Sequence, residues 1–401
     1  MKAKVAATDL KKAVNALQAL QRLSGEGGKK TSEAGGFKGR LQVAEGRLLI
    51  DVVNSGAYVQ KTIEAKMLRE GSIGVDLVEV NKYRLSGTVT IEYDHNVKLV
   101  HFSTSKAKYD LPADQDAADI IENTKPTDYE MPIVARIPAD TLAQAAALVA
   151  IKPGLKQEEM RMQFDLRPAD ENGKASMEVV GLDFYSYGRC LRRSADIKVK
   201  SHTRFILKAV SLSTILGSIE GATVDIGVER NAEETRLVRF KSADADLFYP
   251  TLEAAFLDAE EVYKETTQGT INCAFTALRK NIREAIATVK TVSSTSAVPL
   301  TLNIKVEGKE VLMAAQEGGK SSMAKIATST AKARNGGPVV MCLNQHYFES
   351  VLNLAPEVTP LQVELWNEKR VIVKAAEGES GRIEYFMAQV DPDLLEESTT
   401  S

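Results

Sequence analysis

One short unit, a few strand-like apolar residues followed by an amphipathic helix, returns six times along the 401-residue chain. The expected helices span residues 8–22, 76–85, 139–152, 207–219, 275–290 and 343–354, so the unit recurs about every 68 residues. Apolar residues in these segments follow the 3.6-residue helical spacing, as Leu10, Val14 and Leu17 do in the first. Each helix is therefore expected to bury one face.

Segments with alternating apolar and polar residues lie between these helices, for example residues 39–53, 300–315 and 361–376. A period of two predicts half-buried antiparallel strands. The tripeptides EGR, EGK and NEK interrupt these three segments and predict hairpin turns. The fold class predicted is α+β, and the six units pair into three repeated domains, each with two helices packed on antiparallel sheets.

The length of the chain and two polar connecting segments locate the domain boundaries. A chain of 401 residues exceeds what one hydrophobic core holds. Residues 114–132 and 250–269 are polar and read as linkers. We therefore predict domains at residues 1–125, 126–258 and 259–391, followed by an acidic C-terminal tail at residues 392–401.

The residues that carry enzymatic chemistry or bind metals are not arranged for either task. The four histidines are dispersed, no histidine or cysteine stands at zinc spacing, and no G-x-S-x-G elbow occurs. Gly319, Lys320 and Ser321 resemble the end of a phosphate-binding loop, but Ala314 stands where its first glycine belongs, so a hairpin is predicted there. We predict a protein with no catalytic residues, no metal and no cofactor.

Cysteine usage and hydropathy indicate the compartment. The chain has three widely spaced cysteines, which are interpreted as reduced thiols packed in the core. No apolar run approaches the ~18 residues that cross a bilayer, and the first residues lack the apolar core of a secretion signal. A soluble cytoplasmic protein without a membrane partner is expected.

Basic residues gather on the expected helices although the chain as a whole has a net charge of −3. The six helical segments contain eleven basic and six acidic residues. A basic set of helices on an acidic protein favours a polyanionic partner, although basic side chains also simply solvate helix faces. The candidate residues that would face such a polyanion are Lys11, Lys12, Arg22, Lys82, Arg84, Lys152, Lys208, Arg279, Lys280, Arg283 and Lys290.

Several strings, in order along residues 1 to 391, resemble bacterial DNA polymerase sliding clamps, the β-subunit processivity factors of DNA polymerase III. KVAATDLKKAVNALQAL resembles the opening strand and helix of that family, and GSIGVDLVEVNKYRLSG resembles its second helix. KAKYDLPA resembles the edge strand that follows. MEVVGLDFYSYGR, SADADLFYPTLEAAF and RIEYFMAQV resemble three later family segments.

The resemblance implies a ring of six domains, closed by two identical chains, with helices inside and sheets outside. Such a ring encircles double-stranded DNA without reading its sequence and tethers the polymerase for processive synthesis. Tyr109 and Leu111 of one chain are then expected to contact Val289 and Val292 of the other. Polymerase and clamp loader are expected to bind through short hydrophobic peptides.

The peptide pocket implied by the resemblance is rich in aromatic and aliphatic side chains. Its candidate residues are Leu182, Phe184, Tyr185, Ser186, Tyr187, Pro250, Val371, Val373, Met387 and Ala388. Of the family's usual segment around this pocket only Asp183 is kept, and Ala388 replaces a proline. Such departures fit a phage- or plasmid-encoded member of the family. The aromatic residues alternatively pack as ordinary strand residues.

Two other functions and the role of the tail stay open. A ring-forming structural protein would use the same repeat without DNA, and an enzyme would place a site between domains near Asp183. In the tail, Gln389, Leu394 and Leu395 resemble the glutamine and hydrophobic pair with which partners bind clamp pockets. The polar ending EESTTS favours a frayed terminus instead.

Overall fold

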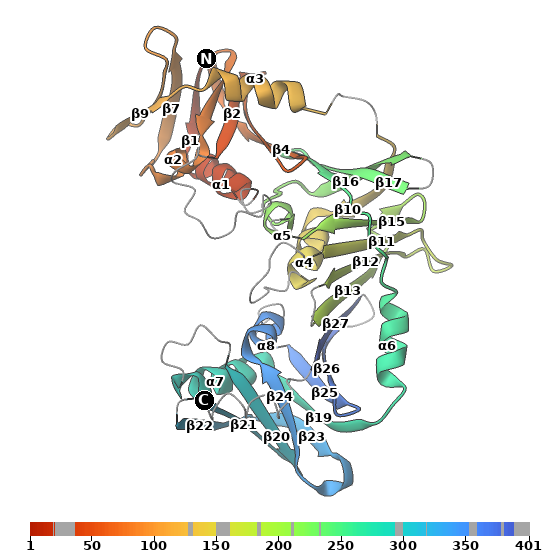
Figure 1. The fold of residues 1–401 in the computed structure, drawn as a ribbon. Helices are drawn as coiled ribbons and strands as arrows, with labels where there is room; N and C mark the ends of the chain where they lie inside the picture. Colours follow the sequence, from red (N-terminus) through yellow and green to blue (C-terminus); the bar gives the residue numbers. More distant parts are fainter. Residues whose placement is uncertain are drawn as a thin grey trace. The chain divides into compact units, whose positions relative to one another are not determined.

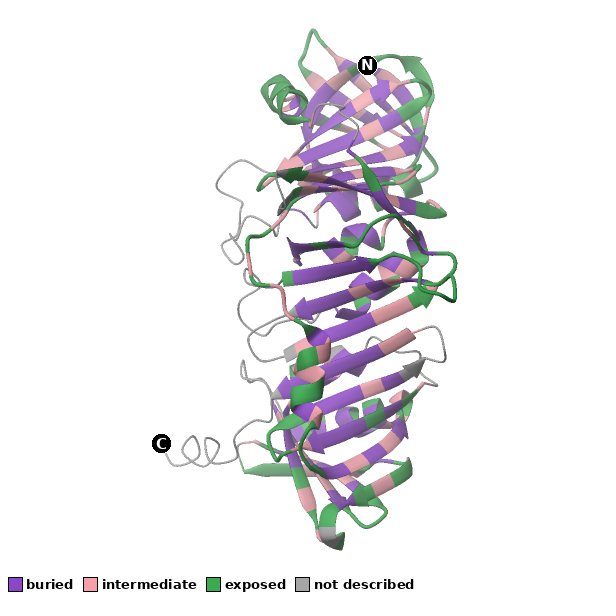
Figure 2. Ribbon diagram, turned by 90° about the vertical axis from the view of Figure 1, so that its right-hand side faces the viewer, coloured by how far each residue is buried: buried purple, intermediate pink, exposed green. Residues whose placement is uncertain are grey.

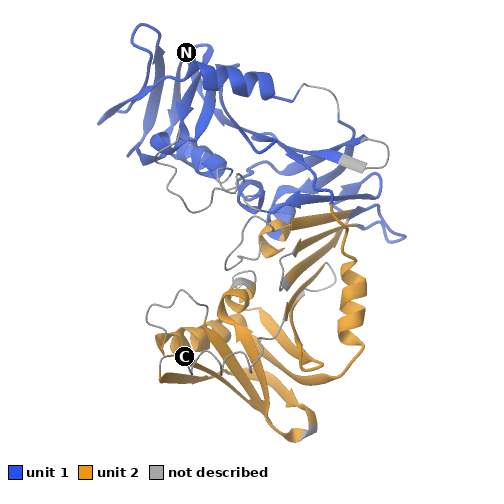
Figure 3. Cartoon of the chain, viewed as in Figure 1, with its two compact units in different colours: residues 1–144, 166–175, 195–253 blue, residues 145–165, 176–194, 254–401 orange. Residues whose placement is uncertain are grey.

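The computed structural model describes residues 1–18, 20, 37–126, 131–149, 161–182, 186–209, 212–231, 234–292, 300–317, 319–352, 359–377 and 381–388. The chain divides into two compact units (Figure 3). Unit 1 comprises residues 1–144, 166–175 and 195–253, and unit 2 comprises residues 145–165, 176–194 and 254–401. The boundaries of the three domains remain a prediction from the sequence.

Most of the elements of unit 1 come from the first third of the chain. Its helices are α1 (Ala7–Gln18), α2 (Leu77–Lys82), α3 (Gln115–Thr124) and α5 (Leu212–Leu216). Its strands are β1 (Lys2–Ala6), β2 (Lys38–Ala44), β3 (Arg47–Asn54), β4 (Ala57–Glu64), β5 (Lys66–Arg69), β6 (Gly71–Asp76), β7 (Thr88–Asp94), β8 (Leu99–Ser103), β9 (Lys108–Pro112), β10 (Ile133–Pro138), β14 (Lys198–Val199), β15 (Thr203–Lys208), β16 (Thr223–Asn231), β17 (Glu234–Lys241) and β18 (Ala245–Pro250).

Unit 2 holds the last third of the chain and part of its middle. Its helices are α6 (Ala259–Thr267), α7 (Arg279–Val289) and α8 (Gln345–Leu352), while α4 (Ala139–Val149) has residues in both units. Its strands are β11 (Arg161–Arg167), β12 (Ala175–Leu182), β13 (Ser186–Ser194), β19 (Ile271–Leu278), β20 (Thr301–Glu307), β21 (Glu310–Glu317), β22 (Lys320–Lys325), β23 (Thr328–Ala333), β24 (Val339–Asn344), β25 (Pro360–Trp366), β26 (Arg370–Glu377) and β27 (Gly381–Ala388).

Unit 1 contains two antiparallel sheets (Figure 1). The smaller has the order β5-β1-β7-β8-β9, and the larger runs β14-β10-β16-β17-β18-β4-β3-β2-β6. The larger sheet repeats the strand pattern of the smaller one as far as β18, which then pairs with β4. We call this β18–β4 pairing the first joint.

Unit 2 repeats the arrangement. Its large sheet includes the run β11-β12-β13-β27-β26-β25-β19-β23, and its small sheet has the order β22-β21-β20-β24. In one half of this sheet the strands pair in the order β23-β19-β25-β26-β27. This order corresponds to β14-β10-β16-β17-β18 in unit 1. We call the β13–β27 pairing the second joint.

The sixfold strand-then-helix unit is confirmed. Strands β1, β6, β10, β15, β19 and β24 are each followed within four residues by α1, α2, α4, α5, α7 and α8, respectively. Some helices are shorter than expected, because residues 207–208 and 275–278 belong to the preceding strands. The predicted hairpin turns are also confirmed: Glu45 with Gly46, Gly308, and Asn367 with Glu368 have positive φ angles, which tight two-residue hairpins require.

Both segments that were predicted to be linkers contain a helix, which corrects that interpretation. Asp114 caps α3 by accepting a hydrogen bond from the amide of Ala117, and Asp258 caps α6 by bonding the amides of Glu260 and Glu261. Helix α3 contacts β6, β2 and β3. A Cβ atom on Gly74 of β6 would lie 2.2 Å from the Asp114 carbonyl oxygen, so only glycine permits this close approach.

The core lies along the strands, many of which are buried through their middle and exposed at their ends (Figure 2). Strand β7 instead alternates, burying Val89, Ile91 and Tyr93 between half-buried residues. The three cysteines are free and buried, as predicted. Burial raises the pKa of the Cys190 thiol to about 11 and that of Cys273 to about 12, which makes both poor nucleophiles at neutral pH.

Candidate nucleic-acid interface

Helix α1 carries the first group of basic candidates in unit 1. It packs against β1, β3 and β4 and contacts helices α2 and α5. Its Leu10, Val14 and Leu17 are buried as their spacing predicts, which leaves Lys12 exposed and Lys11 half-buried. The apolar stripe of the helix therefore determines which of its lysines reach solvent.

Three other basic candidates of unit 1 lie at or beyond the ends of their elements. Lys82 is the last residue of α2, and the exposed Arg84 follows that helix. Lys208 ends strand β15 and is half-buried, so it does not belong to a helix as expected. Arg22 and Lys152 lie outside the described residues.

Helix α7 of unit 2 has the densest cluster of basic residues. Arg279, Lys280 and Arg283 lie in or next to its first turn, which contains no acidic residue, and its N-cap Leu278 makes no side-chain capping bond. Cations at this end oppose the helix dipole, each by about 0.3–1 kcal/mol. Helix α6 has the stabilising arrangement instead, with Asp258, Glu260 and Glu261 at its start. Lys280 and Arg283 are exposed, whereas Arg279 is half-buried. The cluster on α7 thus weakens its own helix and concentrates positive potential at one end of it.

Several of the basic candidates are paired with carboxylates. Lys12 Nζ lies 3.1 Å from Glu220 Oε1, and Lys82 Nζ lies 2.5 Å from Glu79 Oε1. Lys290, which follows α7, lies 3.0 Å from Glu349 of α8. Arg84 and Lys280 form no ion pair with any residue that the structure describes. Exposed pairs of this kind are weak, so phosphate oxygens can replace the carboxylates.

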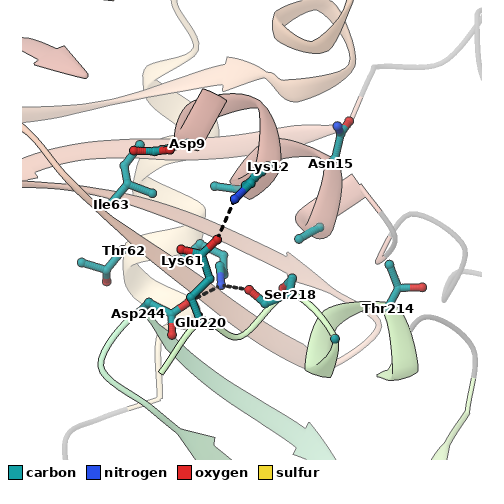
Figure 4. Close-up of a pocket in the computed structure, with 13 residues that line it drawn as sticks. Asp9, Lys12, Asn15, Lys61, Thr62, Ile63, Thr214, Ser218, Glu220 and Asp244 are labelled. Atoms are coloured by element: carbon teal, nitrogen blue, oxygen red, sulfur yellow. Dashed lines mark hydrogen bonds and ion pairs between the residues drawn. The ribbon is translucent and has the colours of Figure 1, made fainter. Parts of the chain in front are cut away.

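A cavity of about 450 Å³ lies beside Lys12, among α1, β4, α5 and the turn after α5 (Figure 4). Lys61 is buried there and donates to Asp244 Oδ2 at 2.6 Å and to the Ser218 carbonyl oxygen at 2.8 Å. Burial by itself would raise the pKa of Asp244, but hydrogen bonds from Lys61 and from the Glu220 amide outweigh it and lower the pKa. The charged groups thus satisfy one another, and the bond from Lys61 to Ser218 connects β4 with the turn after α5.

The predicted peptide pocket is only partly described. Phe184 and Tyr185 lie outside the described residues, as do the side chains of Leu182, Ser186 and Ala388. Tyr187 is half-buried, and its ring stacks on Phe386 with centroids 4.1 Å apart. In unit 2, Val371, Val373 and Met387 are buried, while Pro250 of unit 1 is exposed. The valines therefore present little surface, and the pocket stays a prediction.

The residues predicted to join two chains are mostly core residues of their own chain. Leu111, Val289 and Val292 are buried, and Tyr109 is half-buried and stacks on Tyr83 with centroids 4.3 Å apart. These four residues can support an interface between two chains from inside their own chain. The exposed atoms that would contact the other chain belong to neighbouring residues. Strands β9 and β22 lie at the ends of their sheets. Their backbone edges are the surface that pairing would use.

Two buried charge clusters, one in the sheet of each joint, were not predicted from the sequence. Arg40 of β2 donates from Nε to Asp51 Oδ2 at 2.8 Å and also contacts Glu122 of α3. Arg189 of β13 lies 2.5 Å from Glu178 and 3.4 Å from Glu384. Its Nη1 also lies 2.9 Å from Glu260 of α6. Charged residues at alternating positions of otherwise apolar strands were the available signal.

Among the described residues, no group of three or more histidine, cysteine and carboxylate side chains could hold a metal ion. The glycine near Lys320 forms the turn of the β21–β22 hairpin, with a φ angle of 78°, as predicted. In the part of the chain that is described, no helix has the length and apolarity to cross a bilayer.

No known family model matches the sequence, and no curated protein matches it. Solved structures do match, over nearly the whole chain. The DNA polymerase III β subunit of Thermotoga maritima is 15% identical with a TM-score of 0.71, covering 97% of this chain and 99% of its own. The sliding clamp of Bacillus subtilis is 12% identical with a TM-score of 0.69, covering 98% and 99%.

A third structure is the β clamp of Helicobacter pylori bound to a DNA ligase peptide. It is 16% identical with a TM-score of 0.66, covering 98% of this chain and 100% of its own. The chain therefore has the fold of the bacterial sliding clamps, as the resemblance predicted, in a strongly divergent sequence.

Proposed function

We propose that this chain is a DNA sliding clamp, which encircles duplex DNA and tethers the replicative polymerase for processive synthesis. The observation that carries the proposal is the match to clamp structures along almost the entire chain, which includes the sixfold strand-then-helix unit. The distribution of charge by itself would not have been enough to propose this function. The protein acts as a non-catalytic subunit in the cytoplasm, where it needs no cofactor.

A ring needs a second copy of the chain. The three domains, at residues 1–125, 126–258 and 259–391, supply half of a six-domain circle. Within the chain, a five-stranded half of one large sheet is completed by a four-stranded half across the first joint. The small sheet of unit 1 has five strands and that of unit 2 has four. Two copies joined through these small sheets would therefore form a sheet of the same size at each remaining junction.

Attraction to DNA in this proposal is electrostatic and non-specific. The clusters on α1, α2 and α7 would contact phosphates, and Arg279, Lys280 and Arg283 carry the largest share because they are concentrated at one helix end. Contacts to phosphate position a protein without reading bases, so the ring can slide. The net charge of −3 limits attraction elsewhere.

Partners bind the clamp through short hydrophobic peptides in this proposal. The region around Tyr187 and Phe386 would receive them, and the polymerase and the clamp loader would compete for it. The DNA ligase peptide bound to the Helicobacter pylori clamp supports this mode of recognition. Peptide specificity should differ from that of other clamps, because the segment that includes Asp183 departs from theirs.

Retention on circular DNA tests the proposal. Clamp loaded onto nicked circular DNA should stay bound during gel filtration and should be lost after the circle is linearised. Equal retention on circular and linear DNA, or none on either, would refute encirclement. A ring-forming structural protein gives the second outcome.

The DNA-facing residues are tested by changing Arg279, Lys280 and Arg283 together to alanine. These side chains lie outside the apolar stripe of α7, so the fold should persist while loading weakens and its salt dependence becomes shallower. Alanine at three exposed lysines elsewhere, Lys66, Lys174 and Lys309, removes the same charge and should have a much smaller effect. Equal losses in both triple variants would show that only net charge matters.

A further inference from the structure

Strands β6, β15 and β24 stand at the same place in the internal repeat. Each has six residues, lies at the end of its sheet, and is followed by a short helix, α2, α5 or α8. The outer edge of an end strand carries backbone groups that can pair with another chain, so native proteins usually cover it. How each of these three edges is covered can therefore be compared.

The first two edges are covered by the chain segment that leaves the last strand of the same repeat. After β9, the Asp114 amide donates to the Gly74 carbonyl oxygen of β6 at 2.9 Å. After β18, the Leu252 amide donates to the Ile206 carbonyl oxygen of β15 at 2.8 Å. Both donors are the second residue after their strand, and both acceptors are the fourth residue of theirs. We call this contact the edge bond.

Strand β24 directs its backbone groups in the same way as β6. Leu77, which follows β6, donates to the Phe37 carbonyl oxygen before β2 at 2.9 Å. Gln345, which follows β24, donates to the Leu300 carbonyl oxygen before β20 at 3.0 Å. The direction of backbone groups alternates along an antiparallel strand, so the fourth residue of each strand, three positions earlier, directs its carbonyl oxygen outward. In β24 this residue is Cys342.

The segment after β27 corresponds to the segments that form the two edge bonds. Strand β27 closes the strand order of its repeat as β9 and β18 close theirs, and it ends at Ala388. The second residue after it is Val390, in a stretch outside the described residues. Among the described strands, none pairs with the outer edge of β24. A segment attached to the same unit has a high effective concentration there, which favours it over a strand from another molecule.

The residues next to Val390 suit a single bond followed by a change of direction. Pro392 has no amide hydrogen to donate, so strand pairing ends before it. Asp391 and Pro392 are also residue types that begin helices. In unit 1, Asp114 likewise both makes the edge bond and caps α3.

The side chain of Cys342 does not prevent an edge bond. In β6 the equivalent residue is glycine, because a Cβ atom on Gly74 would lie 2.2 Å from the Asp114 carbonyl oxygen. In β15, however, the equivalent residue is Ile206, and the bond to Leu252 still forms. A segment that approaches β24 as Leu252 approaches β15 therefore has room beside a cysteine.

We propose that the Val390 amide donates to the Cys342 carbonyl oxygen, so that the segment after β27 covers the edge of β24 as its counterparts cover β6 and β15. This third edge bond depends on neither DNA nor a second copy of the chain. It closes the edge against the addition of a foreign strand. It also fixes the role of Gln389, which is held beside the bond and cannot begin a peptide motif for the predicted pocket.

Disulfide trapping tests the pairing, because Cys342 already supplies one thiol. Opposed residues of an antiparallel pair have Cβ atoms about 4.5–5.5 Å apart, within reach of a disulfide after a small adjustment. Val390→Cys should therefore form a bond to Cys342 within one chain after mild oxidation, identified by peptide mass spectrometry. Val390→Cys combined with Cys342→Ser should not form it.

Two further variants control for the reach of the segment. Gln389→Cys would direct its thiol to the opposite face, and Thr399→Cys lies nine residues beyond Val390. Each should form the bond to Cys342 at least tenfold less than Val390→Cys. Equal trapping in all three variants would overturn the pairing. Covalent dimers in place of the bond within one chain would overturn its assignment to the same chain.

Truncation gives an independent measurement. Removing residues 389–401 should open the edge of β24, so the Cys342 thiol of the folded chain should react with iodoacetamide at least tenfold faster. A chain that ends at Val390 keeps the edge bond and should react at the rate of wild type. Cys190 and Cys273 are buried elsewhere and serve as internal controls. An unchanged Cys342 rate after the longer truncation would overturn the proposal, and because no assay contains DNA, the proposed function is tested separately.

Discussion

The first and second joints have the same strand register but different charges. At the first, Arg40 and Asp51 are 2% and 0% exposed and pair one to one in the interior, while the Glu122 side chain that reaches Arg40 from α3 is 59% exposed. At the second, Arg189 meets Glu178, Glu260 and the fully buried Glu384, so carboxylates outnumber it. Arg382 partly compensates by binding Glu384 at 2.6 Å.

This difference shows what the repeated fold constrains and what it leaves free. A tyrosine lies opposite a phenylalanine in both joints, Tyr58 with Phe248 and Tyr187 with Phe386. Backbone register and this aromatic pair are the same in both joints, because pairing of the strands and cover by a helix need them. The ion clusters need only enough opposite charges and hydrogen bonds to compensate each buried charge. Several different sets of residues can provide them. The two joints should therefore respond differently to mutation and to pH.

The largest effect is expected from Arg40→Met. Removing this guanidinium leaves the Asp51 carboxylate buried without its partner, which should lower the free energy of unfolding by about 3–5 kcal/mol. Urea denaturation of the full chain, followed by circular dichroism, measures the loss. The double variant Arg40→Met with Asp51→Leu should recover most of it, because no buried charge is then unpaired. A single variant within 1 kcal/mol of wild type would contradict this account.

An intermediate effect is expected from the aromatic pairs. The Tyr58 and Phe248 rings meet edge to face with centroids 6.0 Å apart, whereas Tyr187 and Phe386 are stacked at 4.1 Å. Both geometries are favourable, so double-mutant cycles with leucine should give coupling energies of about 0.5–1.5 kcal/mol in each joint. A coupling near zero in one joint would show that its pair only fills space.

The smallest effect is expected from Glu384 and depends on pH. Burial raises the pKa of its carboxyl group, although Arg382, Arg189 and Lys374 act in the opposite direction. Just above the ordinary value of 4.5, the folded protein then keeps a proton that the unfolded chain releases, so stability increases as the pH falls through the raised pKa. Urea denaturation at decreasing pH above 4.5 should show wild type gaining stability relative to Glu384→Gln.

Asp244 of unit 1 provides a control of opposite sign. Its pKa is lowered, so the stability that it contributes is present above its ordinary value of 3.8 and is lost as the pH falls through the lowered pKa. Wild type should lose stability relative to Asp244→Asn only in that acidic range. If Glu384 behaved in the same way, the two clusters would not differ as described.

Local sequence determined the repeating parts of this protein. The 3.6-residue stripe of α1, the alternation in β2 and β3 and the turn residues Glu45 and Gly46 act between near neighbours, so they could be predicted from the printed letters. The same applies to the hairpin at Gly319, where a phosphate-binding loop was the competing interpretation. Helices α3 and α6 were missed, because their polar composition resembles that of a linker and only packing on a sheet reveals their buried face.

The candidate site was predictable only where helix faces decide it. Lys280 and Arg283 are exposed as the sequence predicted, since their own helix leaves them outside its apolar stripe, whereas Lys11 is half-buried. The sequence did not show that Val371 and Val373 of the predicted pocket are fully buried within the chain, because that depends on strands and helices distant in sequence.

The joints themselves were decided by tertiary structure. Arg189 and Glu384 are 195 residues apart, and Tyr58 and Phe248 are 190 residues apart, so no local pattern connects them. A buried arginine is tolerable only where folding brings carboxylates to it, since an unpaired charge in the interior costs several kcal/mol. The sequence thus specified strands that could form joints. The packing of α3 and α6 over the two joints within the chain determined where aromatic rings and buried ions could be used.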